Sequence, residues 1–112
     1  MDNINELIDS AAQYLNRLAP GVIGLADEAR FALHIDIERI RDIYEGIGWM
    51  MEAIASIPFA DLGLVPIEAH EGTMTKHLKE LLSSYERSDY VYLADILEYE
   101  IYPVICGWME AF

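Results

Sequence analysis

The sequence predicts an all-α fold, an antiparallel four-helix bundle with one long central helix and one substantial loop. Apolar residues recur every three or four positions in successive segments, as on one face of a helix. The tyrosine-rich residues 90–103 mix apolar side chains and carboxylates at both odd and even positions, so they lack the alternation of a strand. With 112 residues, of which 54% are apolar, the chain can bury one core. We therefore expect residues 1–112 to form a single helical domain.

The first helix is predicted near the start of the chain. Its apolar face comprises Ile4, Leu7, Ile8, Ala11, Tyr14, Leu15 and Leu18. Pro20 and Gly21 follow, and a proline lacks the amide hydrogen and disfavours helical geometry in the residue before it. We therefore expect this helix to end at the Pro20-Gly21 pair.

The longest periodic segment predicts one helix from about residue 22 to residue 57, ending before Pro58. Its seam comprises Leu33, Ile37, Ile40, Tyr44, Ile47, Met51 and Ile54, extended backwards by Val22, Ala26 and Ala29. The next residues, IPFADLGLVPIEAHEG, contain two prolines and two glycines. The first half of this stretch is the expected loop.

Two more helices complete the predicted bundle. Helical spacing resumes in the set Ile67, Met74, Leu78, Leu81 and Tyr85. Pro66 is expected to open this third helix. Ser88 or Asp89 is expected to cap a fourth helix over residues 90–109. Its core seam is predicted to comprise Tyr90, Ala94, Leu97, Ile101, Val104 and Trp108.

The charge balance restricts the possible partners. Twenty Asp and Glu residues stand against seven Lys and Arg residues, which gives a formal net charge of -13. Nucleic acids and anionic membranes attract basic surfaces, so we expect neither as a partner. The only cysteine, Cys106, excludes an internal disulfide, and the first residues lack the positive charge of a secretion signal. We therefore expect a cytoplasmic protein.

No pattern in the sequence indicates catalysis. The Glu-x-x-His motif of helical metal sites, the calcium loop, the Gly-rich phosphate loop, the Cys-x-x-Cys pair and the Gly-x-Ser-x-Gly turn are all absent. Cys106 has no histidine within its own predicted helix to act as a base. We expect no cofactor, no metal and no enzyme activity, with a carboxylate-metal enzyme as the alternative.

The tyrosines of residues 90–103 allow two interpretations. In the first, a small bundle surrounds this helix and buries the rings. In the second, Tyr92, Ile96, Tyr99 and Tyr102 form a docking face, because tyrosine is enriched at interfaces. Pro103 is expected to interrupt the helix, so that the last turn tilts and exposes Trp108.

A second apolar face is predicted on the long helix, opposite its main seam. It comprises Phe31, Ile35 and Trp49. Two partly apolar faces suggest a homodimer around a twofold axis. Scattered exposed rings are also normal on monomers, so both states remain open.

The segment RSDYVYLADILEYEIYPVICGWME, residues 87–110, resembles the closing segment of uncharacterised small acidic helical proteins of Gram-positive bacteria. This resemblance implies no activity and no site residue. From the aromatic faces and the negative charge we expect a protein that binds a basic or amphipathic helical protein partner, as an adaptor, chaperone or inhibitor. An immunity-type inhibitor of a basic protein is the alternative within this class.

Overall fold

The computed structural model describes residues 2–112 of the chain, and their side chains from Asn3 onwards. Every regular element within this range is helical, which confirms the predicted all-α class. The segments in chain order are α1 (Asp2–Phe31), α2 (Ile37–Ser56), α3 (Glu71–Glu86), α4 (Tyr90–Asp95), the π-helix η1 (Ile96–Ile101) and α5 (Tyr102–Ala111). The last three segments follow one another without a break and form one rod, which we call the C-terminal rod.

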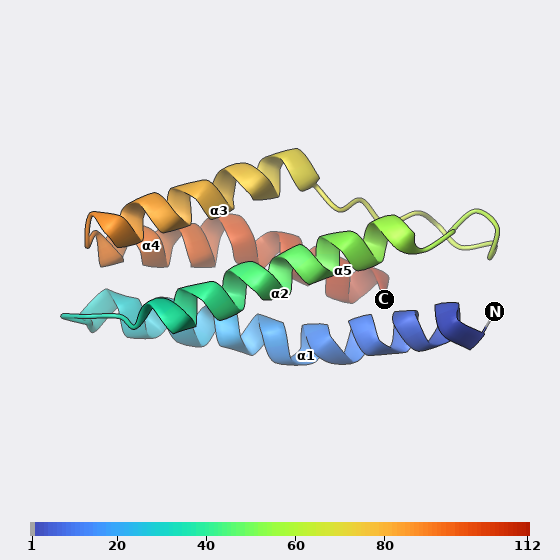
Figure 1. Cartoon of the computed structure of the whole chain (residues 1–112), viewed down its shortest axis with the longest axis horizontal. Helices are drawn as coiled ribbons and strands as arrows, with labels where there is room; N and C mark the ends of the chain where they lie inside the picture. Colours follow the sequence, from blue (N-terminus) through green and yellow to red (C-terminus); the bar gives the residue numbers. More distant parts are fainter. Residues whose placement is uncertain (1) are drawn as a thin grey trace.

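The rods lie lengthwise in a body of 48 × 23 × 19 Å. In Figure 1, α1 runs from the N-terminal end to the opposite end, α2 returns, α3 runs back and the C-terminal rod returns again. α1 packs against α2 and the C-terminal rod, and α3 packs against the same two. α2 therefore lies diagonally opposite the C-terminal rod. None of the helices that the structure describes combines the length and the apolar character of a membrane span.

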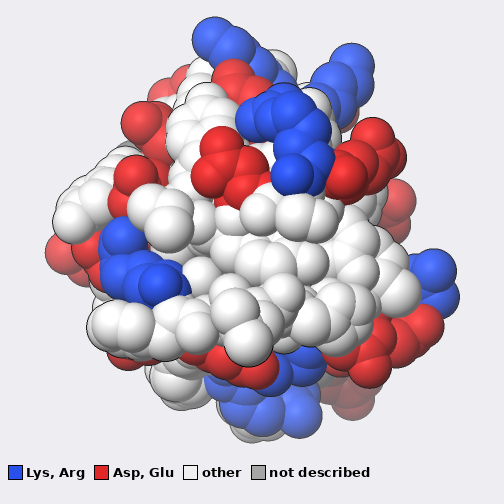
Figure 2. Space-filling model, turned by 90° about the vertical axis from the view of Figure 1, so that its left-hand side faces the viewer, with Lys and Arg blue, Asp and Glu red and all other residues white. Residues whose placement is uncertain are grey.

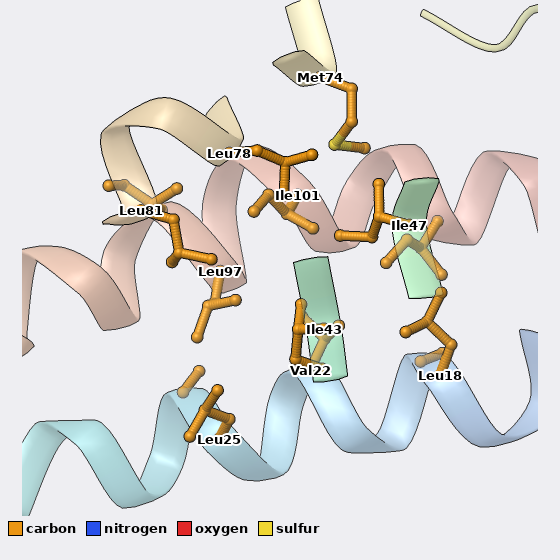
Figure 3. Close-up of a cluster of buried hydrophobic side chains, with 14 of the residues drawn as sticks. Leu18, Val22, Leu25, Ile43, Ile47, Met74, Leu78, Leu81, Leu97 and Ile101 are labelled. Atoms are coloured by element: carbon orange, nitrogen blue, oxygen red, sulfur yellow. The ribbon is translucent and has the colours of Figure 1, made fainter. Parts of the chain in front are cut away.

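All four rods contribute side chains to one core (Figure 3). α1 and α2 meet there through apolar residues that include Val22, Leu25 and Ile47. From α3 and the C-terminal rod come, among others, Leu81 and Leu97. Burial of this apolar surface is the main term that stabilises the fold.

α1 continues through Pro20 and Gly21, so the prediction that the first helix ends there is wrong. Pro20 itself is exposed to solvent. The apolar stripe is buried on both sides of it, in the set Leu15, Leu18, Ala19, Val22, Leu25 and Ala26. A proline inside a helix costs about 3 kcal/mol, and burying even two side chains of this size offsets that cost.

The predicted helix over residues 22–57 is also wrong, because residues 32–36 separate two helices. The Asp36 carboxylate accepts a hydrogen bond from the Glu38 amide (3.0 Å) and caps α2. α2 is therefore a separate helix, and its buried positions only partly continue the apolar repeat predicted from residue 22. It buries Ile43, whereas Tyr44, which was predicted to lie on the seam, is exposed.

α3 begins at Glu71 and not at Pro66. His70, just before it, has a left-handed backbone with φ of 54°. The carbonyl oxygen of Glu68, within the preceding loop, accepts a hydrogen bond from Trp108 Nε1 (3.0 Å). This contact from a distant rod holds the loop in a non-helical course.

The C-terminal rod begins as predicted, since the Asp89 carboxylate accepts from the Tyr92 amide (3.2 Å). Its middle widens into η1, where the Tyr102 amide donates to the carbonyl of Leu97, five residues back. Pro103 has no amide hydrogen, and its ring would crowd the carbonyl four residues back in a regular α-helix. The wider turn accommodates the proline, and helix continues to Ala111.

Candidate functional site

The predicted tyrosine face is not one surface in the structure. Ile96 is 1% exposed, because η1 turns it into the core, so it is wrong as a surface residue. The Tyr92 hydroxyl donates to the Glu80 carboxylate of α3 (3.2 Å). The Tyr99 ring instead lies 5.9 Å from the guanidinium of Arg30 on α1. The two exposed tyrosines therefore lean towards opposite neighbours of the C-terminal rod.

Arg30 joins α1 to the C-terminal rod beside Tyr99. Its Nη1 lies 2.9 Å from Asp95 Oδ1 and its Nη2 lies 3.3 Å from Glu98 Oε2. The hydrogen bond to Asp95 raises the pKa of Arg30, loss of hydration opposes this effect, and the contact with Glu98 adds to it. Because Arg30 of α1 forms ion pairs with two carboxylates of the C-terminal rod, this cluster connects the two rods.

Two further residues predicted for a partner surface are buried and are wrong as surface residues, although the burial of Trp108 confirms its predicted place in the core seam. Ile35 is 1% exposed, and its carbonyl accepts from the Tyr85 hydroxyl (3.0 Å), which holds the α1–α2 connection against α3. Trp108 is also 1% exposed, because its indole packs in the core and its Nε1 bonds to the loop. Tyr102 is half-buried beside Cys106, which raises the pKa of Tyr102.

Phe31 lies on the surface, as predicted, at one end of the bundle. It is 89% exposed, and Leu33 next to it is fully exposed. Figure 2 views this end and shows a band of uncharged residues with acidic and basic residues around it. The exposure of Phe31 therefore belongs to the end of the molecule and not to the side of a helix.

Trp49 lies in an open groove between α1 and α2, which we call the first groove. The groove has a volume of about 510 Å³ and is lined by Ser10, Tyr14, Arg17, Asp42, Glu45, Gly46 and Trp49. The rings of Tyr14 and Trp49 meet edge to face, with centroids 5.5 Å apart. The guanidinium of Arg17 lies 5.6 Å from the centroid of the Tyr14 ring. The groove thus combines two aromatic rings with three charged groups.

Gly46 allows Tyr14 to reach across to α2. A methyl group at Gly46 would clash with the Tyr14 hydroxyl oxygen, so no larger residue fits while the ring stays in place. Burial raises the pKa of Tyr14, Arg17 opposes this effect, and the nearby Asp42 carboxylate adds to it. A close approach of backbone and ring therefore shapes the floor of the first groove.

The carboxylates of the first groove have no internal partner. Within the described residues, neither Asp42 nor Glu45 forms a salt bridge. Arg41, adjacent to Asp42 in the chain, pairs with Glu38 instead (3.0 Å). Arg17 offsets one of the two negative charges, so the groove keeps a net negative charge.

A second groove lies on the other side of α2, towards α3. Its volume is about 380 Å³, and its lining residues are Ile37, Arg41, Tyr44, Glu45 and Leu82. Ile37 and Tyr44 are 36% and 37% exposed. Glu45 lines both grooves, so the two grooves flank the exposed face of α2.

Sequence reasoning found Trp49 but missed the other residues of the first groove. The periodicity of the first helix predicts Tyr14 on a core face, and its contact with Trp49 depends on how α1 packs on α2. The one local signal is Gly46, a glycine inside a strongly periodic helix, which indicates a close approach. Among residues 3–112, no three His, Cys, Asp or Glu side chains converge to hold a metal ion.

Comparison with protein families identifies a matching family model. The family model of a domain of unknown function, DUF8042, matches residues 6–111. Curated proteins and solved structures give no match. The matched range includes both walls of each groove.

Proposed function

Since the chain belongs to the DUF8042 family, a domain of unknown function, we propose its function from the structure: it binds a basic protein partner without catalysing a reaction. The observation that carries this proposal is the first groove, where two aromatic rings lie beside two unpaired carboxylates. We therefore propose α2 as the contact surface. The C-terminal rod is a poorer surface, because Ile96 and Trp108 are buried in it.

Charge complementarity supports a basic partner. The net charge of -13 attracts a cationic protein over a distance of about one Debye length and raises its association rate. At contact, a cationic side chain gains both from a carboxylate and from the face of an aromatic ring. An immunity-type inhibitor of a basic protein is one form of this function.

Affinity capture from the native host tests the proposal. The bait is the full chain, the chain with Asp42→Asn and Glu45→Gln, or a control with Glu52→Gln and Asp61→Asn. Glu52 and Asp61 are exposed acids outside both grooves, so the two variants lose the same charge.

We expect the full chain and the control to capture the same basic protein, less of it at high salt. The groove variant is expected to bind it about tenfold more weakly, because two charge-assisted contacts are lost. Equal capture by the groove variant and the control would contradict the proposal, as would capture that is indifferent to salt.

A further inference from the structure

We infer that the partner contacts this protein through an amphipathic helix that lies across α2. It places a cationic side chain in the first groove and a large apolar side chain in the second groove. The inference rests on the proposed function and extends it by naming the chemistry of the contacting segment.

The two grooves form one continuous surface. Glu45 lines both of them and lies on the exposed face of α2 between them. The only helices that pack on α2 are α1 and α3, so this face has no helical neighbour within the described chain. A segment that enters one groove therefore passes over Glu45 before it reaches the other.

The first groove suits a cation. Trp49 is 40% exposed, and Arg17 already occupies the neighbourhood of the Tyr14 ring, so the indole is the ring open to a partner. Asp42 and Glu45 lie beside it without a cationic partner of their own. An incoming ammonium or guanidinium group compensates this charge and contacts the indole.

The second groove suits an apolar side chain. Ile37 and Tyr44 leave about a third of their surfaces exposed, and Leu82 of α3 forms the opposite wall. An apolar side chain that covers these surfaces removes them from water, and large apolar or aromatic anchors of this kind dominate interface energies. Arg41 and Glu45 at the edges form a polar rim.

The geometry sets the spacing on the partner helix. The grooves flank α2 and share Glu45, so we take their separation to be about the width of a helix with its side chains, roughly 10 Å. Two turns of a partner helix, roughly seven residues, cover the same distance. The cationic and apolar residues of the partner are therefore expected about seven positions apart.

Synthetic helical peptides test this inference directly. The parent peptide carries one Lys and one Leu about seven positions apart on an Ala- and Gln-rich background. Three control peptides replace Lys by Gln, replace Leu by Gln, or bring Lys and Leu onto adjacent turns. A fourth carries a central Pro that breaks the helix. Binding to the full chain is measured by calorimetry and by the emission of the exposed Trp49.

We expect the parent peptide to bind about tenfold more tightly than each control. A double-mutant cycle tests whether Lys contacts Glu45. Replacing Lys by Gln in the peptide is expected to weaken the affinity about fivefold less for the Glu45→Gln protein than for the Glu52→Gln protein. No binding of the parent, or equal binding of the proline or adjacent-turn peptide, overturns the inference.

Two further outcomes separate this inference from the proposed function. If binding of the basic protein from the host requires Asp42 and Glu45 but is unchanged by Ile37→Ser and Tyr44→Ser, the inferred helix across α2 is wrong and the proposed function stands. If sedimentation shows a dimer that Trp49→Ala dissociates, a second copy of the chain covers α2, and the inference is overturned.

Discussion

A single glycine sets the shape of the first groove. Gly46 is buried on α2, and the Tyr14 hydroxyl occupies the space that a side chain at Gly46 would fill. Gly48, two residues along the same helix, has no atom within contact distance of such a side chain. The two glycines therefore form a matched pair, in which the same substitution has different consequences.

Gly48→Ala is expected to raise the free energy of unfolding by up to about 1 kcal/mol, because alanine is the better helix former. Gly46→Ala gains the same propensity but forces the Tyr14 ring to move. We expect it to be about 1–3 kcal/mol less stable than Gly48→Ala and to lose the contact between Tyr14 and Trp49. Urea unfolding and the indole emission measure both effects, and equal stability of the two variants would contradict this account.

Tyr14 also predicts how stability responds to alkaline pH. Burial raises its pKa above the ordinary value of 10.0, so the folded state holds the phenol proton more tightly than the unfolded state does. The contribution of Tyr14 to the free energy of unfolding is complete below about pH 10 and is lost as the pH rises through the pKa of the folded state. The free energy of unfolding is therefore expected to fall between about pH 9 and about pH 11, on the two sides of that value.

Tyr14→Phe is the control for this titration, because it removes the phenol and keeps the ring. The variant is expected to lose less stability over the same pH range. Denaturant unfolding at both pH values measures the difference. An equal loss in the wild type and in Tyr14→Phe would show that other tyrosines account for the alkaline response.

At the scale of the helix, packing decides whether a helix-breaking residue such as proline ends the helix. Pro20 lies in a helix that buries an apolar stripe on both sides of it, and the helix continues. Pro103 lies in a rod whose turn widens before it, and that rod also continues. Residues 32–36 contain no proline or glycine, yet the helix ends there, where Ile35 turns into the core and Asp36 caps the next helix. Long-range packing, together with the local Asp36 cap, therefore determines these helix boundaries.

Pro20→Ala is expected to stabilise the protein. Alanine restores the amide donor and removes the crowding of the proline ring, which together stabilise a helix interior by about 3 kcal/mol. The unfolded chain becomes more flexible at the same time, which lowers the free energy of unfolding by about 1 kcal/mol. The net gain expected in the free energy of unfolding is about 2 kcal/mol. Pro66→Ala is the control, since Pro66 is exposed in a loop and only the entropy effect applies. A Pro20→Ala variant no more stable than Pro66→Ala would contradict this prediction.

At the scale of the whole molecule, the negative charge is largely uncompensated. Within the described residues, four carboxylates pair with an arginine: Glu28, Glu38, Asp95 and Glu98. The other acids of a chain with net charge -13 repel one another in the compact state. The same negative charge that opposes folding through self-repulsion attracts a basic partner.

Salt is therefore expected to affect folding and binding in opposite directions. Raising sodium chloride from about 0.05 M to about 0.5 M shortens the Debye length to a few ångströms and screens the repulsion. We expect the Tm of the free protein to rise by roughly 4 °C, equivalent to about 1 kcal/mol, while the affinity for the basic partner falls. Thermal melts and binding titrations in the same buffers measure both effects, and a Tm that falls with added salt would contradict this view.

The fold was more predictable than the candidate site. Apolar periodicity and the Asp89 cap are local signals, and both correctly indicate helices. For the site, the exposed Trp49 is correctly predicted, but Ile96 is buried instead of lying on a docking face. Trp108 is buried as its place in the core seam predicts, and its predicted exposure after Pro103 is wrong. A helix with apolar residues around most of its circumference does not reveal which of them face its neighbours.

The sequence by itself determined the helical class and the acidic character, because periodicity is a property of neighbouring residues and charge is a sum over all of them. Only the tertiary structure decided that α1 passes through Pro20, that α2 begins as a separate helix at Ile37 and that Tyr14 meets Trp49 over Gly46. These outcomes depend on contacts between residues that lie far apart in the chain. Their energies are comparable to the local preferences that they override.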